Sequence, residues 1–209
     1  LIDPKNGIDA VRDVFIAKGK IIAIGMPPDE FQASRIIDAQ SFIVCPGLVD
    51  LSVRLREPGL EYKATLESEM GAAVAGGVTS FACPPDTDPP LDEPGLVEML
   101  KHRAKSLNQA HVYPIGALTQ GLRGERLTEM AELNDAGCIV FGQPDGLLPN
   151  LRVLMQAMRY ASTFDFSVWL RPQEISLTND GVAHDGEVAT RLGLPTVPVC
   201  AETVALSNI

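Results

Sequence analysis

From residue 46 onwards, short apolar runs alternate with longer stretches in which apolar residues recur at helical spacing. The apolar runs predicted as strands are 48–55, 78–82, 111–117, 138–141 and 166–170. The stretches predicted as helices are 65–75, 93–106, 127–135, 148–164, 186–192 and 201–209. Regular strand–helix alternation with short links favours a parallel sheet covered by helices, which is an α/β fold.

Residues 1–45 follow a different pattern. Alternating apolar runs at 11–17 and 21–25 flank the turn sequence Lys18-Gly19-Lys20, which predicts a β-hairpin. The apolar pairs within 36–39 and 42–44 predict further strand. We therefore expect two parts, a β segment at 1–45 and an α/β domain at 46–209.

Composition narrows the classes of partner. The chain of 209 residues carries 17 basic and 27 acidic residues, a net charge of −10, which argues against nucleic acid or an anionic membrane as a partner. No apolar run reaches membrane-spanning length, and no signal peptide opens the chain. The overall composition is typical of a soluble globular protein.

The four cysteines are widely spaced, each within an apolar stretch, and no Cys-x-x-Cys motif is present. They are Cys45, Cys83, Cys138 and Cys200. We interpret all four as buried free thiols of a protein in the reducing cytoplasm.

The stretch from Cys45 to Gly59 has an apolar core and ends in the turn signal Glu57-Pro58-Gly59. It predicts a buried strand that delivers side chains to a loop at its carboxyl end, where the chemistry of βα barrels is found. This segment resembles the first barrel strand of the amidohydrolase superfamily, and its Leu-Arg-Glu-Pro-Gly tail resembles dihydroorotase. Residues 180–195 also closely resemble the dihydroorotase segment that follows strand five.

The resemblance implies a (β/α)8 TIM barrel preceded by a small β-sandwich segment. Only the first five βα units of such a barrel are visible in 46–209. Because a complete barrel takes about 250 residues, we expect the chain to be part of a longer polypeptide.

The family pattern at the end of the first strand, Asp-x-His-x-His-Leu-Arg, has lost both histidines. Ser52 and Arg54 stand in their places. Alternate residues of a strand point the same way, so two histidines there can bind one divalent metal. Serine is a poor neutral ligand, and at 4 Å an arginine would repel a unit charge by roughly 4 kcal/mol at a dielectric of 20.

The other family positions have changed as well. Asp86 replaces the asparagine that would donate to a substrate carboxylate, and Arg171 replaces the metal histidine after strand five. We hypothesise that Arg54 and Arg171 substitute for the missing metal charge by pairing with Asp86 or Asp50.

After strand four, the ligand position of the family falls on Pro144 or Gln143. Proline has no ligating side-chain atom, and a glutamine amide is a weak oxygen donor. We interpret the following Asp145 as a turn residue. These positions predict a protein without a metal cofactor and without catalytic residues.

Arg56 stands where the family arginine binds the substrate carboxylate. Two interpretations remain open: Arg56 and Asp86 form a vestigial substrate site, or Arg56 pairs with a nearby acid such as Glu57.

The resemblance implies a role in de novo pyrimidine biosynthesis. Degenerate members of the family support the assembly and activity of aspartate carbamoyltransferase, so we expect its catalytic subunit as the partner in a hetero-oligomer. The alternatives are an active zinc-dependent dihydroorotase or related cyclic amidohydrolase, and a protein that binds an anion in an arginine-lined cavity.

Overall fold

The computed structural model describes residues 1–144, 148, 150–178 and 180–209. The described chain divides into two compact units, Leu1–Leu48 and Val49–Ile209. The boundary expected from the sequence lies after residue 45. Each unit is described separately below.

The first unit contains two small antiparallel pairs of β-strands. Strands β1 (Ile2–Asp3) and β2 (Ile8–Asp9) pair around the 3-10 helix η1 (Pro4–Asn6). Strands β3 (Val14–Ala17) and β4 (Lys20–Ile24) form a hairpin, which confirms the hairpin predicted from the sequence.

The strands predicted at 36–39 and 42–44 are wrong, because neither segment lies in a strand. Their apolar side chains are largely exposed, as Ile36 and Phe42 illustrate at 86% and 76%. A strand needs a paired neighbour to satisfy its backbone groups, and the backbone contact of this region with β1 is a hydrogen bond from the Ile2 amide to the Val44 carbonyl.

The centre of the second unit is a five-stranded sheet with the order β5-β6-β7-β8-β9. The first strand, β5 (Leu48–Asp50), begins at the boundary of the unit. The other four strands pair in parallel. Their bounds are Val78–Cys83 for β6, His111–Ala117 for β7, Val140–Gln143 for β8 and Val168–Leu170 for β9. Each of the five predicted strands is therefore present. The bounds of β7 are those predicted, whereas at least one end of every other strand differs.

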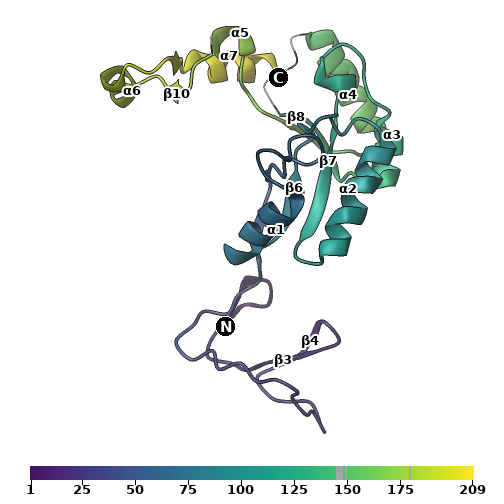
Figure 1. The fold of residues 1–209 in the computed structure, drawn as a ribbon, viewed down its shortest axis with the longest axis vertical. Coiled ribbons are helices and arrows are strands. Elements are labelled where there is room, and N and C mark those ends of the chain that lie inside the picture. Colours follow the sequence, from purple (N-terminus) through teal and green to yellow (C-terminus); the bar gives the residue numbers. More distant parts are fainter. Residues whose placement is uncertain (145–147, 149, 179) are drawn as a thin grey trace. The chain divides into compact units, whose positions relative to one another are not determined.

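Four helices connect these strands, and the last three of them lie together on one side of the sheet (Figure 1). They are α1 (Leu66–Ala75), α2 (Pro94–Leu107), α3 (Met130–Ala136) and α4 (Leu151–Thr163). The main core lies between helices and sheet, where Phe81 and Phe141 from the strands pack against Val97, Leu100 and Ala157 from the helices. Burial of these side chains holds the sheet edges, and thus the loops that follow the strands, in fixed positions.

The remaining elements are short. They are η2 (Gln120–Leu122), α5 (Ile175–Thr178), β10 (Ala183–His184), α6 (Glu187–Leu192), β11 (Thr196–Val197) and α7 (Cys200–Asn208). Strands β10 and β11 pair in parallel around α6. The sequence predicted α6 and α7 but not α5 or this strand pair. Every helix in the described ranges is too short or too polar to cross a membrane.

The expectation of four buried thiols is right for two cysteines and wrong for two. All four are free, but Cys45 and Cys200 are exposed because they lie outside the sheet–helix layer. Cys83 and Cys138 are buried in the core. Burial raises the pKa of each of these two thiols to about 12.

We expect this difference to appear in thiol modification. Because the thiolate is the reactive form, Cys83 and Cys138 should react with 5,5′-dithiobis(2-nitrobenzoate) at pH 8 only when the chain unfolds, whereas Cys45 and Cys200 should react at once. Peptide mapping after a short exposure identifies the modified residues. Rapid labelling of Cys83 in the folded chain would contradict the packing of β6.

Candidate functional site

An ion pair lies at the carboxyl end of the sheet, where the sequence placed the lost metal ligands. The Arg54 Nε atom is 2.5 Å from Asp86 Oδ2. Arg54 follows β5 and Asp86 follows β6, and these strands are neighbours in the sheet. The two side chains are 34% and 15% exposed. The hypothesis that Arg54 pairs with Asp86 is confirmed.

The backbone explains why these side chains meet. Beyond β5 the chain continues beside β6, since the Val53 amide donates to the Ala82 carbonyl at 2.9 Å. Val53 and Leu55 pack into the core between sheet and helices. Side chains alternate along an extended chain, so the intervening Arg54 is directed away from that core. Asp50, the other acid considered as a partner, accepts the Ser52 amide at 2.9 Å.

Two of the degenerate metal positions face solvent. Ser52 and Arg171 are both exposed. Within the described ranges no carboxylate lies at ion-pair distance from Arg171. The hypothesis that a second arginine pairs with Asp86 or Asp50 is therefore wrong for Arg171, because the segment after β9 does not bring its side chain to the Arg54–Asp86 pair.

The position after strand four serves a structural purpose. Gln143, the last residue of β8, donates from Nε2 to the Leu122 carbonyl at 2.8 Å and accepts from Thr119 Oγ1 at 3.3 Å. Thr119 is fully buried and also accepts the Gly124 amide. The glutamine thus fastens the loop after β7 to the sheet edge. Pro144 follows it, half-buried, and the predicted turn residue Asp145 lies outside the described residues.

These residues do not fit the zinc ion that the family resemblance implies. The expected positions hold a hydroxyl, two guanidinium groups and a proline ring, and a guanidinium only donates hydrogen bonds. In the described chain, no three His, Cys, Asp or Glu side chains come together in a metal-binding group. His111 lies at the amino-terminal start of β7, the opposite end of the sheet. No chemical step through a metal follows from this arrangement.

A double-mutant cycle measures the strength of the ion pair. We expect Asp86→Asn and Arg54→Gln each to lower the free energy of unfolding by about 1–2 kcal/mol, since each leaves a partly buried charge without this partner. The double variant should lose less free energy of unfolding than the two single variants lose together, and the difference, the coupling energy, should be about 1 kcal/mol. Urea unfolding gives all four values, and costs that simply add would contradict the pairing.

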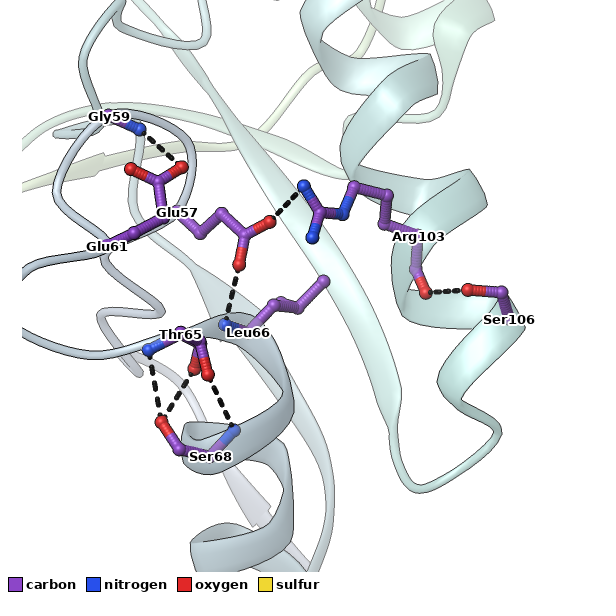
Figure 2. Close-up of polar contacts among 8 residues, drawn as sticks. All are labelled: Glu57, Gly59, Glu61, Thr65, Leu66, Ser68, Arg103 and Ser106. Atoms are coloured by element: carbon purple, nitrogen blue, oxygen red, sulfur yellow. Dashed lines mark hydrogen bonds and ion pairs between the residues drawn. The ribbon is translucent and has the colours of Figure 1, made fainter.

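A second polar cluster holds the loop after β5, and Figure 2 shows its contacts. Glu57 is only 3% exposed; its Oε2 atom accepts the Leu66 amide at 2.8 Å, and its Oε1 atom pairs with the Arg103 guanidinium of α2. Leu66 is the first residue of α1, whose amide has no partner within the helix. Glu57 therefore ties its own loop to two helices.

The start of α1 carries a capping box. Thr65 Oγ1 accepts the Ser68 amide at 3.2 Å, and Ser68 Oγ accepts the Thr65 amide at 3.1 Å (Figure 2). Such a capping box satisfies two free amides at the helix start. In the same loop, Glu61 Oε1 accepts the Gly59 amide at 2.9 Å, and this bond lowers the pKa of the exposed Glu61.

The interpretation that pairs Arg56 with Glu57 is wrong: among the described residues no ion pair joins the two, and Glu57 binds Leu66 and Arg103 instead. Arg56 has φ +63° and its carbonyl accepts the Leu60 amide, which turns the loop sharply. Its side chain is half-buried. The role of Arg56 and Asp86 as a vestigial substrate site stays a prediction.

The contacts of Glu57 were missed by sequence reasoning, although one signal was available. An acidic residue in a Glu-Pro-Gly turn shortly before a helix N-cap can accept an amide at the helix start. Its second partner, Arg103, lies on another helix and has no local signal.

Comparison with known proteins gives the family. The family model described as "Dihydro-orotase-like" matches residues 41–208. A "Dihydroorotase-like protein" of Pseudomonas putida is 50% identical over 208 residues, and one of Pseudomonas aeruginosa is 47% identical. A "Dihydroorotase" of Syntrophotalea carbinolica is 39% identical. Each match covers 100% of this chain and 49% of the relative, so the chain spans about half the length of these curated relatives.

Two solved structures confirm the expected fold class. The L-hydantoinase (dihydropyrimidinase) of Arthrobacter aurescens superposes with a TM-score of 0.72 and 20% identity, over 94% of this chain and 45% of that one. A dihydroorotase of Saccharomyces cerevisiae gives a TM-score of 0.52 and 16% identity, over 78% and 43%. The parallel strands of the sheet and the helices that connect them share the fold of these two structures. With the family model matched over 41–208, the chain belongs to the dihydroorotase-like family.

Proposed function

We propose that this chain is part of a dihydroorotase-like protein that takes part in pyrimidine biosynthesis in the cytoplasm without catalysing the dihydroorotase reaction. Support for the pathway comes from the family and from relatives of 50% and 47% identity that carry the name dihydroorotase-like protein. Support for the loss of catalysis comes from the residues at the sheet edge.

The observation that carries the proposal is the ion pair between Arg54 and Asp86. In an active family member, a histidine at the first of these positions would bind a metal, and an asparagine at the second would donate to the substrate. Here a fixed cation and an anion neutralise each other at the same place. The pair also neutralises part of the positive charge on which an anion-binding cavity would depend, which disfavours that alternative.

The positions that would bind the substrate also favour a loss of catalysis. Dihydroorotate and carbamoyl aspartate both carry carboxylates, which an arginine at position 56 could bind. Asp86 would repel such a carboxylate, because an ionised aspartate only accepts hydrogen bonds. A site of this kind loses substrate affinity together with its metal.

We propose the catalytic subunit of aspartate carbamoyltransferase as the partner, in a hetero-oligomer. The well-packed loops after β5 and β7 support this role, because they preserve the body of the domain although its ligand positions have changed. A domain that only docks needs its shape and not its metal.

Co-purification tests the partnership. The intact polypeptide, tagged and expressed in its own cell, should recover aspartate carbamoyltransferase in fixed stoichiometry. Transcarbamoylase activity should fall when the polypeptide is deleted, and a variant with both Arg54→Gln and Asp86→Asn should restore it, because the proposed role needs no chemistry at this pair. A fully active transcarbamoylase purified from the deletion strain would contradict the proposal.

The second candidate is an active, zinc-dependent dihydroorotase or related cyclic amidohydrolase. Relatives named dihydroorotase, at 39% identity over the whole chain, favour it. It requires metal ligands from parts of the protein other than the described residues. Metal analysis of the intact polypeptide separates the two candidates.

A further inference from the structure

We draw no further inference here: the strongest candidate, the exposed apolar stripe that Leu151, Met155 and Met158 form along one face of α4, carries no proposal because nothing in the structure shows what covers it.

Discussion

Replacement of Gly59 by alanine should strongly destabilise the second unit. Gly59 has φ +86°, and a Cβ atom added there would lie 1.8 Å from the Asp88 carbonyl oxygen and 2.7 Å from its carbonyl carbon. Backbone atoms cannot move aside as a flexible side chain can. We expect Gly59→Ala to lower the free energy of unfolding by about 3–5 kcal/mol, the sum of a left-handed backbone cost and an overpacking cost.

The large effect follows from how two loops pack. The Asp88 amide donates to the Pro58 carbonyl at 3.1 Å, so the loops after β5 and β6 lie against each other at Gly59. Gly193→Ala is the matched control, because Gly193 has φ +66° and a Cβ atom added there would meet nothing within 4 Å. The control isolates the cost of a left-handed backbone at alanine, about 1–2 kcal/mol. Equal losses for both variants in urea unfolding would show that the loops do not touch.

Replacement of Glu57 by alanine should have the second largest effect. It removes the acceptor of the Leu66 amide at the start of α1 and the partner of Arg103 on α2. Charge-assisted hydrogen bonds contribute about 1.5–3 kcal/mol, so we expect a loss of about 2–3 kcal/mol. The value stays in this range because Arg103 is 57% exposed and can be hydrated when its partner is lost.

Two further variants separate the contributions of Glu57. Glu57→Gln keeps an oxygen for the Leu66 amide but loses the ion pair, and should cost about 1 kcal/mol. Glu61→Gln changes an exposed carboxylate of the same loop and should stay within about 0.5 kcal/mol of the wild type. Urea unfolding monitored by circular dichroism gives these values. A cost for Glu57→Ala no larger than that for Glu61→Gln would contradict the structural role.

The parallel sheet could be predicted because strands buried on both faces have nearly continuous apolar sequences. The runs around Phe81, Ile115 and Phe141 all become strands with these residues buried. The same rule wrongly predicted strands at 36–39 and 42–44 in the first unit. Apolar residues at 36–37 and 42–43 indicate strand by composition, but a strand forms only where a partner satisfies its backbone.

The site was predictable where two strand ends are neighbours. Arg54 and Asp86 follow consecutive strands of a parallel sheet, so their proximity follows from topology alone. The position of Arg171 was not predictable, because it depends on the course of the segment after β9. The tie between Glu57 and Arg103 joins residues far apart in sequence, which no local pattern encodes. The structural use of Gln143 was missed for the same reason.

The loss of catalysis is tested most directly by one measurement on the intact polypeptide, purified without its partner. Ring closure of carbamoyl aspartate should be followed with added zinc, together with the zinc content of the protein. We predict no turnover above the uncatalysed rate and no stoichiometric zinc, since a guanidinium paired with Asp86 occupies the place of a metal ligand. Stoichiometric zinc together with measurable ring closure would contradict the account.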